Sequence, residues 1–302
     1  MKQIIWWGPG LSAALRTIVR KANRVGLACL FLARTRRSNL GIMGILALAV
    51  LSASPVKAQD GDLAKESQNP IANLISVPFQ NNTNFNVGPY DHDQNVLNIQ
   101  PVIPFKLNED WNLITRWILP VVYQPAMYEG DKSDFGLGNF NPSFFFTTEV
   151  TTDLMVGVGP TLLLPTATDK SLGVDKWGAG PSAVFVWTPG KWVVGTLANN
   201  IWSFGGDPSD PDVNQFLLQY FINYNMAHGW YLVSAPIITA NWEAADSDQW
   251  TFPLGGGVGR VFNIGSQPVN MSLQAYDNVI TPEGGADWQA RFQVQLLFPT
   301  GG

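Results

Sequence analysis

The residues that could carry chemistry in this sequence are polar side chains in the middle of otherwise apolar segments. Arg116 lies within 111–123, and Arg291 lies within 288–298. In both segments polar and apolar residues alternate, which is typical of a β-strand with two unlike faces. The candidate site residues lie on such polar faces, and they are Gln100, Arg116, Glu149, Gln219, Asn223, Arg291, Gln293 and Gln295.

Candidate groups for catalysis or metal binding are few. A nucleophilic serine needs a base within hydrogen-bond reach, but His92 and His228 both fall in connections between the apolar segments. We therefore predict no catalytic residue and no enzymatic activity. The carboxylates of Asp207, Asp210 and Asp212 could bind a divalent cation, but they lack the twelve-residue calcium-loop pattern. Neither a metal nor a cofactor is predicted.

Charge is unevenly distributed along the 302 residues. Nine of the 18 Lys and Arg, and none of the 23 Asp and Glu, precede Gln59, so the formal charge is +9 before Gln59 and −14 from there onward. Binding to the phosphates of nucleic acid needs a basic surface. The acidic second part therefore excludes nucleic acid as a partner, and the basic first part needs a separate explanation.

Residues 1–58 have the features of a signal segment for export. A basic stretch ends at Arg37, an apolar run covers 41–50, and small residues follow. We predict cleavage after Ala58. A retained membrane anchor is the weaker alternative, because a helix needs about 20 apolar residues to cross a bilayer. The adjacent Arg36 and Arg37 also allow a twin-arginine signal.

From residue 73 onward, apolar segments alternate with breaks of two kinds, and the segments number twelve. Five breaks are short, and they are 108–110, 151–153, 188–190, 227–229 and 264–268. Six connections are longer and carry most of the acidic residues, and they are 87–95, 125–138, 167–176, 205–212, 243–249 and 278–287. Short turns at one end and long loops at the other are typical of a bacterial outer-membrane barrel, with the short turns in the periplasm.

We therefore predict an all-β protein, a transmembrane antiparallel β-barrel of about 12 strands, preceded by a cleaved signal segment. Segments of about ten residues match a tilted span of the bilayer, whereas soluble strands are shorter. Because lipid does not tolerate an open sheet edge, the first strand, near 75–85, must pair with the last. The predicted organisation is a signal segment at 1–58, a periplasmic N-terminal tether at 59–72 and the barrel at 73–302. Whether 60–70 plugs the barrel or only tethers it stays open.

Three stretches of the chain resemble a known family. They are 64–85, 95–105 and 117–123. On these stretches the chain resembles the bacterial outer-membrane proteins of the phenol-degradation meta-pathway family, also labelled transporters or neuromedin U-like proteins. The resemblance covers the mature chain and is strongest over 64–124. It implies a barrel and the passage of small organic molecules, and it carries no catalytic motif.

The predicted function is that of an outer-membrane channel or facilitator for the passive passage of small organic molecules, hydrophobic or aromatic ones included. The alternative is a non-transporting barrel with a structural or surface-binding role. In a channel, the polar faces would line the lumen and set its selectivity. Otherwise Arg116 and Arg291 would belong to a hydrogen-bonded network that stiffens or plugs the barrel. The expected partners are outer-membrane lipid, small organic solutes and the outer-membrane assembly machinery, which the chain meets after export through the periplasm.

Three further features concern the predicted strands. Arg260 lies near a strand end, where we expect an interface anchor. The glycines at 255–257 and 259 indicate a bend or bulge and not a phosphate-binding loop, since no lysine and helix follow them. Proline cannot donate to a ladder, and we expect bulges at the eight prolines in or beside strands, which are Pro101, Pro104, Pro120, Pro160, Pro165, Pro181, Pro236 and Pro253.

Overall fold

The computed structural model describes residues 60–299, which form a single antiparallel sheet preceded by a helix. The signal segment predicted at 1–58 lies outside the described residues. The helical elements are α3 (Asp60–Gln68), η1 (Ala227–Gly229) and η2 (Asp246–Asp248). The strands are β1 (Ile75–Val87), β2 (His92–Ile99), β3 (Val102–Lys106), β4 (Asn112–Gln124), β5 (Asp134–Leu137), β6 (Asn141–Thr151), β7 (Leu154–Leu163), β8 (Lys176–Trp187), β9 (Trp192–Gly206), β10 (Asn214–Asn225), β11 (Trp230–Ser234), β12 (Ile237–Asn241), β13 (Trp250–Ile264), β14 (Gln267–Ile280) and β15 (Trp288–Phe298).

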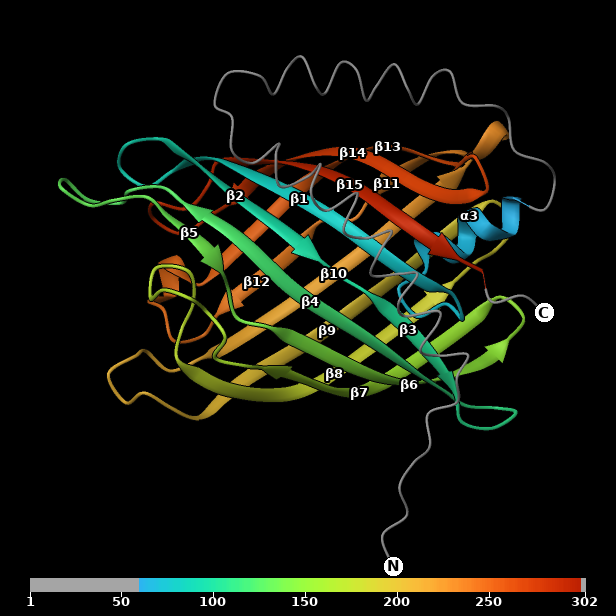
Figure 1. Cartoon of the computed structure of the whole chain (residues 1–302), viewed down its shortest axis with the longest axis horizontal. Coiled ribbons are helices and arrows are strands. Elements are labelled where there is room, and N and C mark those ends of the chain that lie inside the picture. The colour runs from blue at the N-terminus through green and yellow to red at the C-terminus, as the bar shows by residue number, and fades with distance from the viewer. Residues whose placement is uncertain (1–59, 300–302) are drawn as a thin grey trace, which may run out of the picture. The chain divides into compact units, whose positions relative to one another are not determined.

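The sheet closes on itself as a barrel (Figure 1). Three pairs of consecutive segments, β2 with β3, β5 with β6 and β11 with β12, each share a neighbouring strand and form one span, so the 15 segments make twelve spans. The first and last strands, β1 and β15, pair from Ile75 opposite Phe298 to Phe85 opposite Trp288. This pairing leaves no open edge and confirms the predicted twelve-stranded antiparallel barrel.

Proline shapes the ladder in three different ways. Pro101 separates β2 from β3 and Pro236 separates β11 from β12, because a residue without an N–H cannot continue the ladder there. A register shift occurs beside Pro253, just before the glycine run of β13, where a bend or bulge was predicted. The prediction of a bulge at every proline is wrong, since β7 and β8 stay in register where Pro160 faces Pro181. Pro104 and Pro120 also lie within strands, and Pro165 follows β7.

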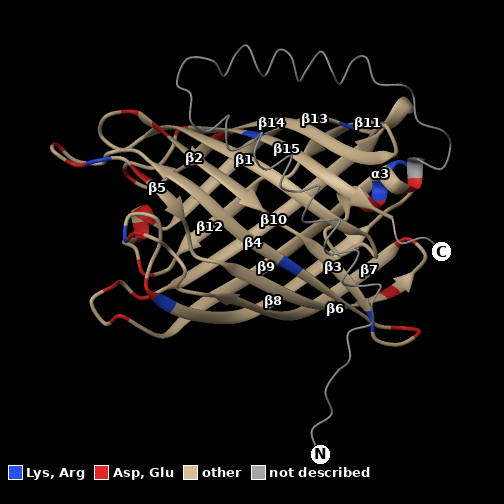
Figure 2. Cartoon of the chain, viewed as in Figure 1, with Lys and Arg blue, Asp and Glu red and all other residues tan. Residues whose placement is uncertain are grey.

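The two ends of the barrel differ as predicted. The turns between β6 and β7 and between β13 and β14 each span two residues, whereas β7 and β8 are joined by 164–175. Figure 2 shows acidic residues concentrated in the loops at the end on the left of the view. The first of these loops is shorter than predicted, 88–91 instead of 87–95, because β2 begins at His92. The tight reversal there uses positive φ at Gly88 and Asp91.

The outer face of the barrel carries large apolar side chains whose exposure to water would be unfavourable. Trp111, Trp187 and Trp202, at or near strand ends, are 42–48% exposed. Indole rings are favoured at the boundary between lipid and water. Arg260 lies on this face, with its guanidinium 5.3 Å from the Trp230 ring centre, an arrangement that suits the predicted interface anchor. Among residues 60–299, no helix has both the length and the apolar character to cross a membrane.

The N-terminal segment, residues 60–74, packs against the inner wall at the end with the short turns. Ile71 is completely buried, in a cluster with inward-facing residues such as Ile114, Phe145 and Phe221. Ala64, Ala72 and Leu74 join a second cluster with Leu297 of β15. The stretch after α3 therefore fills part of the lumen, and the apolar residues on the inner face at this end are buried by it.

Candidate functional site

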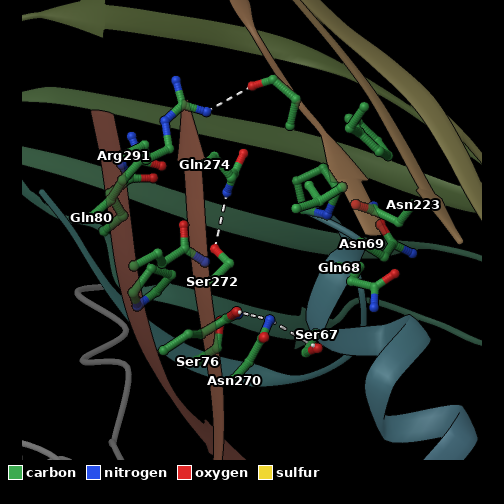
Figure 3. Close-up of a pocket in the computed structure, with 18 of the residues that line it drawn as sticks. Ser67, Gln68, Asn69, Ser76, Gln80, Asn223, Asn270, Ser272, Gln274 and Arg291 are labelled. Atoms are coloured by element: carbon green, nitrogen blue, oxygen red, sulfur yellow. Dashed lines mark hydrogen bonds between the residues drawn. The ribbon is translucent and has the colours of Figure 1, made fainter. Parts of the chain in front are cut away.

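A cavity of about 130 Å³ lies inside the barrel beside the N-terminal segment. Its apolar lining comes from Pro70, Pro78, Val102, Phe221, Tyr231, Val233 and Ala235. Its polar lining comes from Ser67, Gln68, Asn69, Ser76, Gln80, Gln100, Arg116, Gln219, Asn223, Asn270, Ser272, Gln274, Arg291, Gln293 and Gln295. Figure 3 shows Arg291 and Gln274 on one side of this space, with Asn69 and Asn223 on the other.

The cavity brings together seven of the eight candidate residues predicted from the polar faces, which are Gln100, Arg116, Gln219, Asn223, Arg291, Gln293 and Gln295. They come from four separate parts of the chain and meet because the barrel closes. The structure does not bring Glu149 into this group. Glu149 lies close to the end of β6, is exposed, and pairs with Met155 next to the turn into β7.

Arg291 is held firmly by neutral groups. Its Nε donates to Asn82 Oδ1 at 3.0 Å and its Nη1 donates to the Ala235 carbonyl at 2.7 Å. Its guanidinium also stacks over Tyr276, 5.0 Å from the ring centre. The side chain is 3% exposed. Arg291 therefore presents a fixed positive charge to the lumen, which none of the contacts named here neutralises.

Arg116 is held more loosely. It lies on the inner face of β4, two residues after the fully packed Ile114, and its Nη2 donates to Gln100 Oε1 at 2.9 Å. Gln100 is itself fixed by the interruption between β2 and β3, where its backbone N–H donates to the Pro78 carbonyl. In the described chain, Gln100 is the side chain that makes a hydrogen bond with Arg116, and the break at Pro101 positions it.

The structure adds polar residues that the sequence analysis did not select. On β14, Gln274 Nε2 donates to Ser272 Oγ at 3.0 Å, and the Tyr276 hydroxyl donates to Gln274 Oε1. On β1, Gln80 Nε2 donates to Asn82 Oδ1 at 3.3 Å. The signal was present in the sequence, because Asn270, Ser272 and Gln274 alternate with apolar residues along β14 in the same way as the selected residues do along β15.

The N-terminal segment supplies one end of the cavity. Asn270 Nδ2 donates to Ser67 Oγ at 3.2 Å, and Asn69 and Pro70 lie on the lining. Asn223, on the same side of the cavity as Asn69 (Figure 3), is 3% exposed, and its Oδ1 accepts no hydrogen bond in the described chain. A buried acceptor without a donor is unfavourable. A bound molecule that donates a hydrogen bond to Asn223 Oδ1 would remove this cost.

Two of the long acidic loops, 164–175 and 207–213, are joined by ion pairs to lysines. Lys170 Nζ lies 3.0 Å from Asp210 Oδ1 and 3.5 Å from Asp207 Oδ2, and these contacts raise the pKa of Lys170. The pKa of Asp210 is lowered, first by the backbone N–H of Asp175 and then by Lys170. Lys176 contacts Asp212 at 3.0 Å. In residues 60–299 no three His, Cys, Asp or Glu side chains gather as a metal site.

The two histidines occupy unlike positions. His92 begins β2, not a loop as the sequence analysis expected, and its Nδ1 lies 3.1 Å from the Ala126 carbonyl oxygen. His228 is exposed within the tight turn η1, with φ of 59°. In the part of the chain that the structure describes, the hydrogen bonds of these residues include none that joins a histidine to a serine.

No family model matches the chain, and no curated protein matches it. Solved structures do match in fold. An outer membrane channel from Pseudomonas putida F1 has a TM-score of 0.59 and 17% identity, over 74% of this chain and 94% of that chain. The CymD monoaromatic hydrocarbon channel has a TM-score of 0.44 and 10% identity, over 83% and 95%. Outer membrane phospholipase A from Escherichia coli has a TM-score of 0.42 and 13% identity, over 79% and 98%.

At these identities the likeness is one of fold alone. Together, the closed barrel, its apolar outer face and this likeness place the chain among the bacterial outer-membrane β-barrels. The predicted all-β antiparallel barrel of twelve strands and its predicted outer-membrane location are thereby confirmed.

Proposed function

We propose that the protein is an outer-membrane channel or facilitator for the passive passage of small organic molecules, hydrophobic and aromatic ones included. The observation that carries the proposal is the cavity inside the closed barrel, whose lining combines polar residues with apolar ones such as Val102 and Phe221. Its volume of about 130 Å³ is close to that of an engineered cavity of about 150 Å³ that binds benzene. A passage of this size suits single small molecules better than bulky ones.

Two other observations support the same assignment. The sequence resemblance to the phenol-degradation meta-pathway family implies passage of small organic molecules. The protein from Pseudomonas putida F1 that shares the fold is described as an outer membrane channel. The seven candidate residues on the cavity wall would then line the pore. Catalysis is not part of the proposal, because neither His92 nor His228 faces this cavity.

One observation favours a second candidate, a barrel without a transport role. The N-terminal segment fills part of the lumen, and Ile71 is 0% exposed. A segment packed this tightly could serve to stiffen the wall and not to regulate passage. The two functions differ in whether solutes cross when the protein is placed in a lipid membrane.

Reconstitution of the mature protein decides between the two candidates. For a channel we expect discrete single-channel steps in planar bilayers and faster swelling of liposomes in small organic solutes than in solutes too large for the cavity. Liposomes that contain a heat-denatured sample serve as the control. The absence of both steps and solute-dependent swelling would refute the channel and favour the structural role.

A further inference from the structure

The charges on the cavity wall are of one sign. Among the residues that line the cavity, Arg116 and Arg291 are charged, and no Asp or Glu joins them. The three ion pairs of the described chain all involve Lys170 or Lys176, in the outer loops or at the start of β8. A guanidinium stays protonated in proteins, so the lumen holds two positive charges without a carboxylate partner in the described chain.

The two arginines differ in how much of their hydrogen-bonding capacity the protein uses. Arg291 donates through Nε, Nη1 and Nη2 to Asn82, Ala235 and Gln289 and is thereby fixed. Arg116 donates only to Gln100 in the described chain. A guanidinium has five N–H donors in a planar fork that fits a carboxylate. Arg116 therefore keeps donors for a ligand, and Arg291 contributes a fixed positive potential.

The rest of the wall determines the kind of anion. Val102, Phe221 and Val233 give the cavity an apolar side, and its volume of about 130 Å³ admits a body of about the size of a benzene ring. A molecule with one carboxylate, for the unused donors of Arg116, and a compact apolar body, for Val102 and Phe221, would match both parts of the wall.

We propose that this cavity selects small organic monoanions, aromatic or short-chain carboxylates, whose carboxylate binds Arg116 while the apolar body lies against Val102 and Phe221. The inference deepens the proposed channel function by naming its substrate class. Arg291 acts as a positioning charge and not as the primary ligand.

The acidic outer loops are compatible with this substrate class. Repulsion between exposed charges is largely screened beyond about 8 Å at physiological ionic strength, and Asp207, Asp210 and Asp212 are already paired with lysines. A monoanion therefore meets a weak barrier at the rim and a strong attraction at Arg116. A polyanion would be repelled more at the rim, which favours singly charged solutes.

The test compares benzoate with benzamide, a neutral molecule of the same shape, by ligand-detected NMR titration of the purified protein in a neutral detergent. We expect benzoate to bind about ten-fold more tightly than benzamide, as a charge-assisted hydrogen bond would give. The Arg116→Gln variant should lose this preference and keep its benzamide affinity within about two-fold, since its apolar wall is unchanged. Empty micelles correct for partition of the probes.

Arg260→Gln is the matched control, because it removes the same group from the outer face and should keep the preference for benzoate. Equal binding of the two probes to the native protein would overturn the inference without any variant, as would a preference for benzoate that persists in Arg116→Gln. These readouts do not depend on conductance. A protein that conducts without preferring benzoate would therefore refute the carboxylate site alone, and one that prefers benzoate without conducting would refute the channel alone.

Discussion

Arginine in place of Leu273 is expected to destabilise the barrel by about 2–4 kcal/mol in a lipid bilayer, the cost of a positive charge on the lipid face near the midplane. Leu273 lies in the middle of β14, between Val258 and Phe292 on the neighbouring strands, and is 45% exposed. If this position faced water, the same substitution would change the free energy of unfolding by no more than about 0.5 kcal/mol. The measurement is the free energy of unfolding by urea in lipid vesicles, compared between the native protein and the Leu273→Arg variant.

Leu254→Arg provides the matched control. Leu254 is also 45% exposed and lies on β13, about 13 Å along the strand from the residue opposite Leu273, close to the outer loops. Its partner on the neighbouring strand is Asp277, whose carboxylate can form an ion pair with the new guanidinium. The expected cost there is about 0–1 kcal/mol. Equal effects of the two substitutions would mean that the outer face does not contact a bilayer.

Aspartate in place of Ile71 is expected to release the N-terminal segment from the lumen and to increase single-channel conductance. Loss of a buried Ile side chain costs about 2–5 kcal/mol, and an unpaired carboxylate among Ile114, Phe145 and Phe221 adds the cost of its desolvation. The ladder between β1 and β15 does not include Ile71, so the barrel itself should stay closed. Conductance in planar bilayers is the measurement.

Asn73→Asp controls for the added charge, because Asn73 belongs to the same segment but is exposed. This variant should conduct as the native protein does. If Ile71→Asp also leaves conductance unchanged while folding normally, the N-terminal segment does not limit passage through the barrel.

The sequence predicted the strands well because alternation and turn chemistry are local. Apolar and polar residues alternate from Trp288 to Gln295, apolar residues continue to Phe298, and the strand observed is Trp288–Phe298. The start of β2 was less predictable, since His92 to Gln94 are polar and join the ladder only because β1 lies beside them. The barrel closure followed from the requirement that lipid imposes on backbone groups.

The candidate site was predicted in part for the same reason. Polar residues opposite apolar ones on a strand had to face the lumen, and Arg116 and Arg291 do. Glu149 has the same alternation, but β6 ends at Thr151 and its side chain is exposed near the turn. The packing of the N-terminal segment was not predictable, because Ile71 to Leu74 show no periodic pattern and their partners, such as Val186, lie far away in the sequence.

The central claim is that the apolar outer face contacts lipid around a closed sheet. It is tested most directly by the state of the purified mature protein with and without detergent, measured by size-exclusion chromatography with light scattering. We predict a folded, monodisperse species in detergent and aggregation when detergent is removed, with recovery on transfer to lipid vesicles. A folded and monodisperse protein in plain buffer would contradict the membrane barrel, and the channel together with it.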